Sequence, residues 1–243
     1  LGLSEVSSTW KAWFRSQKDW AAVSTVLGSW ATGSAETDMN SMADRIEFCH
    51  DFEKGGITPD FYEFMHLKRH YTKPVYVMIR PKGGPFFYSE AEFSAMKTSI
   101  ITFKEGGANG FVFGILDSEN EIDVRRNQEL LELAGDVPCT FHRAFDRTKN
   151  LEKSIETLIK LGFRTVLTSG GKKSAMDGKE NLKNLVEKYQ HKIEILIGGG
   201  VRSENIEEIK KFTGGTSFHS SAILKYDTFV TENEIKKLKQ LCS

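Results

Sequence analysis

Short apolar segments that read as β-strands recur along this chain, and amphipathic segments that read as helices fill the gaps between them. Their starts are about 24–35 residues apart, which is the length of one βα unit. A series of such units predicts a parallel sheet, and this many favour a (β/α)8 barrel over two separate domains. The seven predicted strands are Asp44–Cys49, Val75–Arg80, Gly110–Leu116, Cys139–Phe145, Arg164–Ser169, Ile193–Gly198 and Ser217–Ser221.

Two helix starts carry a clear sequence signal. Ser89 and Glu92 have the spacing of a capping box, and so do Thr231 and Glu234. Apolar residues then recur at helical spacing, which predicts the buried side of each helix. For the helix after Ser89 these residues are Phe93, Met96, Ile100 and Phe103.

The first strand is the weakest part of the pattern. Spacing favours Ala21–Val26, with Leu3–Ser8 second. The first 42 residues hold all four tryptophans and end in ATGSAETDMNSM, which has weak helix propensity. We interpret residues 1–42 as a divergent or poorly formed first βα unit, an extension, or an artefact of the gene model. Residues 43–243 are predicted to form a single barrel domain.

The composition excludes several classes of protein. Lysine plus arginine and aspartate plus glutamate both total 33, so no global field draws the chain to nucleic acid or to an anionic membrane. No apolar run approaches the roughly 18 residues of a membrane span. The three cysteines lack disulfide or CxxC spacing, which fits a reducing compartment. We expect a cytoplasmic protein.

Charged side chains interrupt two of the strands, and alternation along a strand predicts which way they point. In Asp44–Cys49 the apolar pair Ile46 and Phe48 suits the helix layer. That turns Arg45, Glu47 and Cys49 towards the barrel interior.

The same reasoning adds further polar groups to the interior. Phe141 and Phe145 suit the helix layer, and Arg143 on their side needs a partner near the rim. Arg80 ends its strand, and His219 alternates inward from its neighbours. The residues of Cys139–Phe145 expected inside are Thr140, His142 and Ala144.

Unpaired charge inside a barrel costs several kcal/mol per ion, so these groups must neutralise one another or face a ligand. One interpretation is a network of Arg45, Glu47 and Arg80 that only satisfies itself. The other is a functional site, because Cys49 and Arg80 fall at the carboxyl ends of strands, where barrel enzymes build their active sites.

Two small-residue stretches belong to the same end of the barrel. Glycine allows backbone amides to approach an anion, and the loops after the last two strands are the usual phosphate site of barrel enzymes. A tight turn before a helix is the alternative interpretation. The predicted anion-binding residues are Gly198, Gly199, Gly200, Ser220 and Ser221.

Seven motifs occur here in the order typical of the CutC copper homeostasis family, and the chain resembles that family over about residues 43–222. They are ADRIEFC, GGITP, VMIRPKGG, FHRAFD, VLTSGG, GGGV and FHSSA. The resemblance implies a (β/α)8 barrel, a cytoplasmic setting, and Cu(I) bound by cysteines at the barrel mouth.

The chain departs from the family pattern in its first strand, where the resemblance implies a glutamate and a cysteine. By spacing these positions fall near Val23 and Ser24, and by pattern Glu5 is followed by Ser7 in place of the cysteine. Only Cys49 of the implied cysteine pair is present. The segment after FHSSA is also shorter than is usual in the family.

Copper(I) prefers soft thiolate ligands and accepts imidazole. Cys49 is the predicted principal ligand, with a bridge between two copies of the chain as one alternative. Cys139 begins its strand and reads as a small buried hydrophobe. The histidines that could complete the site are His50, His142 and His219.

Three functions remain open at this point: a copper-binding homeostasis protein, a barrel enzyme acting on a small phosphorylated or carboxylated metabolite, and a scaffold whose site has decayed. For the enzyme, Glu47 and His142 would form an acid–base pair while Arg80 holds the anion. The expected partners are a copper ion and a small anionic metabolite, with no nucleic acid and no membrane. Association into a homo-oligomer is left open.

Overall fold

The computed structural model of the chain describes residues 24–29, 41–51, 54–224 and 231–242. Its strands form a closed barrel in the order β1 to β8, and every neighbouring pair is parallel. The predicted parallel α/β barrel is confirmed, and all seven predicted strands are present. The strands are β1 (Ser24–Ser29), β2 (Arg45–Phe48), β3 (Val75–Met78), β4 (Gly110–Phe113), β5 (Cys139–Phe141), β6 (Thr165–Thr168), β7 (Glu194–Ile197) and β8 (Ser217–Ser220).

The first strand lies later than spacing predicted. β1 runs from Ser24 to Ser29 and pairs with both β2 and β8, which closes the barrel. It overlaps the end of the favoured candidate, Ala21–Val26, whereas Leu3–Ser8 lies outside the described residues. β1 contains neither the glutamate nor the cysteine that the family pattern implies there.

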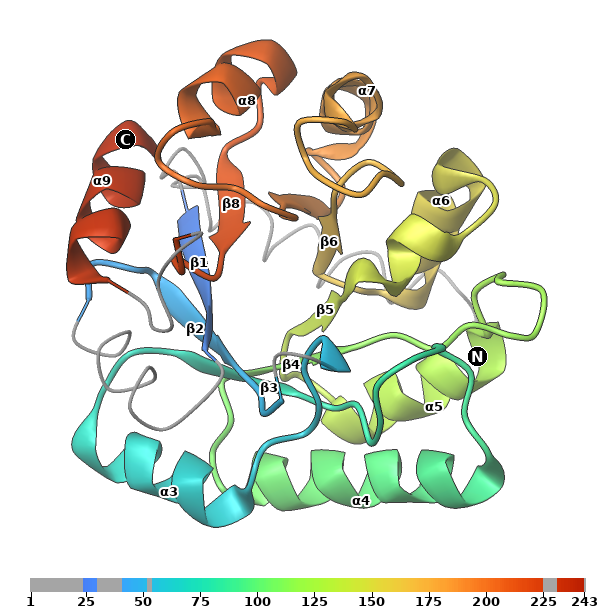
Figure 1. The fold of residues 1–243 in the computed structure, drawn as a ribbon. Helices are drawn as coiled ribbons and strands as arrows, with labels where there is room; N and C mark the ends of the chain where they lie inside the picture. The colour runs from blue at the N-terminus through green and yellow to red at the C-terminus, as the bar shows by residue number, and fades with distance from the viewer. Residues whose placement is uncertain (1–23, 30–40, 52–53, 225–230, 243) are drawn as a thin grey trace.

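Helices surround the strands on the outside of the barrel (Figure 1). The capping box at Ser89 forms as predicted, and the four predicted apolar residues of α4 are all buried. Glu234 instead accepts hydrogen bonds from the backbone and hydroxyl of Ser203, so it ties the last helix to the loop after β7. The helices are α3 (Phe61–His70), α4 (Glu90–Glu105), α5 (Val124–Ala134), α6 (Leu151–Leu161), α7 (Lys179–Tyr189), α8 (Ile206–Thr213) and α9 (Glu232–Cys242), with a 3-10 helix, η2, at Arg143–Arg147.

The main hydrophobic core lies between the strands and the helices, as parity predicted. Ile46, Phe48, Phe141 and Phe145 are all fully buried in it. The barrel interior instead holds small separate apolar clusters, one of which contains Cys49 with Met78 and Val112. Polar side chains therefore occupy much of the space inside the sheet.

The fifth strand is shorter than predicted. It ends at Phe141, and the chain then turns into η2, with His142 as the residue that caps it. Alternation stops where the strand stops, so Ala144 packs in the main core rather than inside the barrel. This turn also carries Arg143 to the rim.

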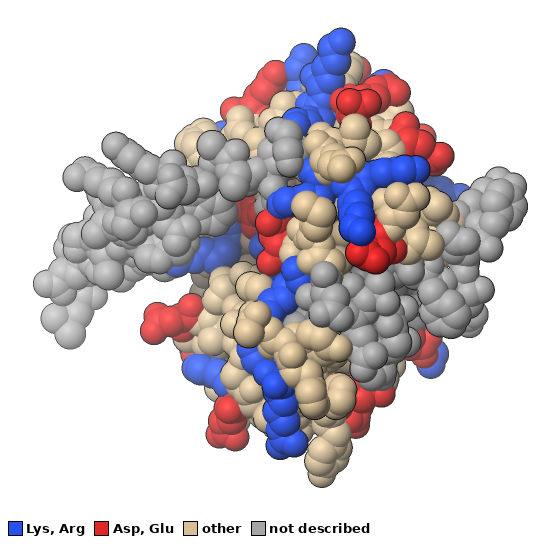
Figure 2. Space-filling model, turned by 90° about the vertical axis from the view of Figure 1, so that its left-hand side faces the viewer, with Lys and Arg blue, Asp and Glu red and all other residues tan. Residues whose placement is uncertain are grey.

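The surface charge is mixed. On the face drawn in Figure 2, lysine and arginine lie beside aspartate and glutamate. Among the described residues, no helix combines the length and the apolar character needed to cross a bilayer.

Candidate functional site

A cavity of about 330 Å³ opens at the mouth of the barrel, where the strands end. This volume is within the range of small-molecule sites. Its lining comes from β2, β3, β6 and β8 and from the segments that follow β2, β3, β5, β7 and β8. The lining residues used below are Glu47, Cys49, Arg80, Phe86, His142, Arg143, Gly199, Gly200, Arg202, His219, Ser220 and Ser221.

Below this cavity, Arg45 connects two sides of the barrel. Its guanidinium lies 3.3 Å from Glu194 of β7 and 3.5 Å from Glu47 of β2, and it stacks 4.5 Å from the centre of the Tyr76 ring. Thr165 donates a further hydrogen bond to Glu194. Burial alone would lower the pKa of Arg45, but the Glu194 and Glu47 carboxylates raise it above its ordinary value. Arg45 is therefore a charged structural connector.

Glu47 links that connector to the cavity. It is 2% exposed, and its carboxylate lies 3.3 Å from Nε2 of His219. Burial alone would raise the pKa of Glu47, but hydrogen bonding and charge from His219, together with the charge of Arg45, lower it. Glu47 stays ionised and fixes the orientation of the His219 ring.

Arg80 does not join the network predicted for it. Its guanidinium donates to the backbone carbonyls of Lys54, Gly55, Gly56 and Gly84, and it lies 4.8 Å from the centre of the Phe86 ring. Carbonyl oxygens of two loops thus satisfy a charge that the sequence suggested would be paired with Glu47. Parity placed Arg80 correctly at the mouth but could not show which loops would fold over it.

His142 is buried at the mouth with one nitrogen engaged and one unpaired. Nδ1 accepts a hydrogen bond from the backbone of Ala144, so the ring proton lies on Nε2. Nε2 has no hydrogen-bond partner among the described residues. Burial and the nearby charge of Arg80 lower the pKa of His142 to about 3. His142 is a neutral hydrogen-bond donor at neutral pH.

Cys49 lines the cavity and is 2% exposed. Burial and the Glu47 carboxylate raise the pKa of its thiol well above the ordinary value, against a smaller opposing effect of Arg80. A bridge through two copies of Cys49 would require this enclosed thiol to become exposed. None of the three cysteines forms a disulfide, and Cys139 is buried in the core as predicted.

The other predicted metal ligands are not all brought together. His219 lines the cavity with Cys49, but His50 does not and instead pairs with Glu63 of α3. Within the part of the chain that the structure describes, no group of three or more histidine, cysteine or acidic side chains is placed to hold one metal ion.

The predicted anion loops meet at the mouth, but an arginine already occupies their hydroxyls. Arg202 donates to Oγ of Ser220 and to Oγ of Ser221. Gly199 and Gly200 line the cavity with φ values of 98° and 78°, which glycine adopts readily. The sequence analysis missed Arg202, although its place just after the GGGV motif marks it as a rim residue.

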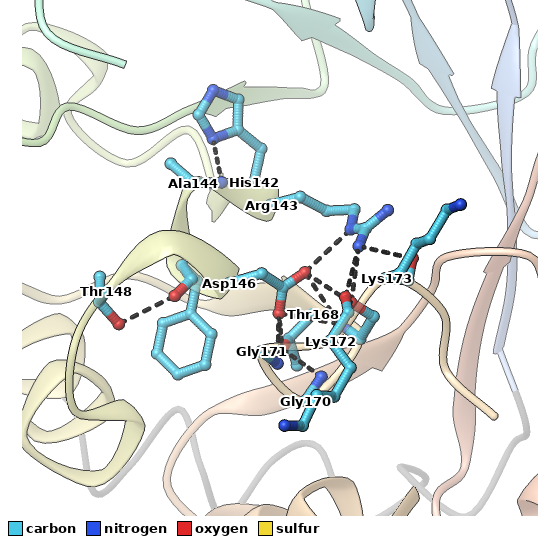
Figure 3. A network of polar contacts seen from close by, with 12 residues as sticks. His142, Arg143, Ala144, Asp146, Thr148, Thr168, Gly170, Gly171, Lys172 and Lys173 are labelled. Carbon is cyan, nitrogen blue, oxygen red and sulfur yellow. Dashed lines mark hydrogen bonds and ion pairs between the residues drawn. The ribbon is translucent and has the colours of Figure 1, made fainter. Parts of the chain in front are cut away.

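Arg143 was predicted to need a partner near the rim, and that partner is Asp146. Nε of Arg143 lies 2.9 Å from the Asp146 carboxylate, and its Nη2 donates to Oγ of Ser169. Figure 3 shows the Asp146 carboxylate at the centre of a network that includes Thr168 at the end of β6 and Gly171 of the loop that follows. Asp146 is the second residue that the sequence analysis did not single out.

Together the fold and the cavity define a closed, parallel α/β-barrel protein with a ligand-sized, arginine-lined site at the carboxyl ends of its strands. The chain belongs to the CutC family, whose model matches residues 30–224. The resemblance carried by the sequence motifs is confirmed.

Curated relatives share this assignment. Proteins from Homo sapiens and Mus musculus, both named copper homeostasis protein cutC homolog, are 42% identical over 180 residues and 39% identical over 215 residues. The matches cover 74% and 87% of this chain, and 66% and 79% of the relatives. The chain thus spans slightly less than two thirds of the human relative.

Solved structures agree on the fold. The crystal structure of a putative copper homeostasis protein CutC from Streptococcus agalactiae is 30% identical, with a TM-score of 0.77, and the match covers 82% of this chain and 98% of that one. A thiamine phosphate pyrophosphorylase from Pyrococcus furiosus has a TM-score of 0.60 at 17% identity, covering 91% and 96% of the two chains. At that identity the similarity is one of fold alone.

Proposed function

We propose that this chain acts in copper homeostasis in the cytoplasm and that it binds Cu(I) at the mouth of its barrel. Membership of the CutC family and the names of the relatives support the copper role. The observation that supports the site is that Cys49 and His219 line the same cavity. A thiolate with one imidazole suits a soft ion of low coordination number.

His219 has the supporting contact typical of a histidine ligand. A metal-binding histidine usually donates its other ring N–H to a carboxylate, which fixes the tautomer. The Glu47 carboxylate, 3.3 Å from Nε2 of His219, supports this arrangement and leaves Nδ1 as the donor atom for the ion.

The other two histidines fit less well. Coordination through Nε2 of His142 would require a proton on Nδ1, the atom that already accepts from the Ala144 backbone. His50 pairs with Glu63 and does not line the cavity. The proposed ligand set is therefore Cys49 and His219, a smaller set than a cysteine pair in two strands would provide.

Cu(I) titration against a competing chelator, without oxygen, tests this site. We expect Cys49→Ser to weaken Cu(I) binding on the order of 100-fold or more, because it removes the only thiolate at the mouth among the described residues. Cys139→Ser is the matched control, since Cys139 is also 2% exposed but lies in the core. Equal binding by wild type and Cys49→Ser would place copper elsewhere.

The raised pKa of the thiol adds a second measurement. Because the Cys49 thiol is protonated before the ion binds, coordination releases a proton. The apparent affinity of the wild type should rise about tenfold for each pH unit between pH 6 and 8. A flat dependence would contradict thiolate coordination.

A barrel enzyme or binding protein for a small phosphorylated or carboxylated metabolite is the second candidate. The supporting observation is charge: three arginines, Arg80, Arg143 and Arg202, line the cavity, against one glutamate among its described residues. In this function His142 would donate a hydrogen bond rather than act as a base, because its pKa of about 3 keeps it neutral. Glu47, which the sequence predicts as the acid–base partner of His142, would remain the ionised residue of that pair.

A further inference from the structure

We propose that Arg143, positioned by Asp146, is the residue that binds the anionic group of a small phosphate- or carboxylate-bearing metabolite in the barrel-mouth cavity. This inference deepens the second candidate function and rests on it for the class of ligand. It replaces Arg80, which the sequence analysis assigned to the anion.

Comparison of the three cavity arginines shows which one is available. Both terminal nitrogens of Arg80 donate to backbone carbonyls, and its Nε, which has no partner among the described residues, is buried. All three guanidinium nitrogens of Arg202 donate, Nε to the carbonyl of Ile223 and the terminal ones to Val201 and the two serines. Nη1 of Arg143 makes no hydrogen bond to any described residue, whereas its Nε and Nη2 are engaged.

The available nitrogen lies beside the glycine loop after β7. A Cβ atom added at Gly199 would sit 3.3 Å from Nη1 of Arg143 and 3.2 Å from its Cζ, so any larger residue here would crowd the guanidinium. The backbone N–H groups of Gly199 and Gly200 make no hydrogen bond to the described residues either. An oxyanion bound here would meet a guanidinium edge next to a glycine backbone, a combination suited to phosphate or carboxylate.

Asp146 fixes the direction in which Arg143 points. The carboxylate of Asp146 accepts from Nε of Arg143, from Oγ of Thr168 and from the backbone of Ser169 and Gly171. Its side chain is 6% exposed. The Nε contact with Asp146 orients the guanidinium (Figure 3), and the other contacts fix the loop after β6. Nη1 is thereby held beside Gly199, which lines the cavity.

An independent observation at the same turn also indicates a ligand oxygen. His142, the residue before Arg143, presents a buried Nε2–H that has no hydrogen-bond partner among the described residues. Buried donors in folded proteins are nearly always satisfied. A ligand oxygen in the cavity that His142 and Arg143 both line would satisfy this donor.

Calorimetric titration of the full chain at low ionic strength tests the assignment, with inorganic phosphate and oxalate as the two probes. We expect at least one probe to bind. Arg143→Gln should lower the affinity for that probe by about tenfold or more, because it removes one charge-assisted contact. Arg147→Gln is the matched control, because Arg147 is exposed, lies four residues away on the same turn and does not line the cavity. Its affinity should equal that of the wild type.

The positioning role of Asp146 needs a measurement that a merely structural role would not affect. Introduced alone, Asp146→Asn should lower the affinity for the probe. Introduced together with Arg143→Gln, it should cause no further loss of affinity, because the two residues act through one contact. A thermal unfolding midpoint for each variant verifies that the barrel is folded. An additive loss in the double variant would overturn the positioning role.

The remaining outcomes separate this inference from the function on which it rests. If the wild type binds a probe and Arg143→Gln binds it equally well, the assignment of Arg143 is wrong and anion binding stands. If the folded wild type binds neither probe, the assignment of Arg143 and the anion-binding function are both wrong. The probe that binds more tightly identifies the anionic group as phosphate or carboxylate.

Discussion

At the scale of single residues, burial decides the charge of His142. Its ring lies at the barrel mouth with Nδ1 capping η2, and its pKa is about 3. The unfolded chain binds a proton at this residue near pH 6.5, whereas the folded chain does not until much lower pH. The folded state is therefore favoured above pH 6.5 and loses stability as the pH falls below that value.

The resulting prediction concerns acid stability. His142→Phe keeps a ring of similar size but cannot titrate, so the free energy of unfolding should depend less steeply on pH between 6.5 and 4.5. The wild type should lose up to about 1.4 kcal/mol more per pH unit over that range. Urea unfolding across this range measures the slopes, and His191→Gln, at an exposed histidine, should keep the slope of the wild type. Parallel slopes for wild type and His142→Phe would contradict a neutral buried histidine.

At the scale of secondary-structure elements, local hydrogen bonds decide where helices and strands end. Ser89 accepts from the backbone of Glu92, and Glu92 accepts from the backbone of Ser89, so α4 begins where the sequence predicts. After β5, by contrast, the capping contact of His142 begins η2 and ends the strand early. The start of α4 has a recognisable capping motif in the sequence. The end of β5 has no such motif, because His142 stands among apolar residues.

The capping box predicts a measurable local contribution. Ser89→Ala leaves the Glu92 backbone N–H without its acceptor and should lower the free energy of unfolding by about 1 kcal/mol. Ser94→Ala, at an exposed position in the same helix, is the matched control and should be neutral or slightly stabilising. Chemical unfolding of the three proteins gives the comparison. A loss as large for Ser94→Ala would show that the cap is not responsible.

At the scale of the whole molecule, buried charge spans the barrel interior. Arg45 of β2 reaches Glu194 of β7, so strands that are not neighbours in the sheet are joined through its centre. Removing one partner of a buried pair leaves an uncompensated charge, which costs more than the pair itself contributes.

This predicts that removing Arg45 alone costs much stability and that a second substitution at Glu194 recovers part of it. Arg45→Met should lower the free energy of unfolding by about 3–5 kcal/mol. Adding Glu194→Gln should recover part of the loss, because it neutralises the carboxylate left behind. Lys188→Met, which breaks an exposed ion pair with Glu152, should have little effect. A double variant as unstable as the sum of its parts would contradict the coupling.

Much of the fold was readable in the sequence because its signals are local. Strand spacing predicted the barrel, and alternation placed Ile46 and Phe48 in the outer core while turning Glu47 and Cys49 inward. The exceptions have local causes too: β1 carries a weak pattern, and Ala144 was misplaced because its strand ends at Phe141.

The sequence by itself determined the family, the order of the strands and the residue types that reach the barrel mouth, because each depends on periodicity or motif within one short segment. Only the tertiary structure decided the partners of those residues. Arg80 pairs with loop carbonyls, Arg202 takes the serine hydroxyls, and Arg143 keeps a nitrogen available. These choices depend on loops distant in sequence that meet at one end of the barrel, and no local pattern encodes which donor reaches which acceptor there.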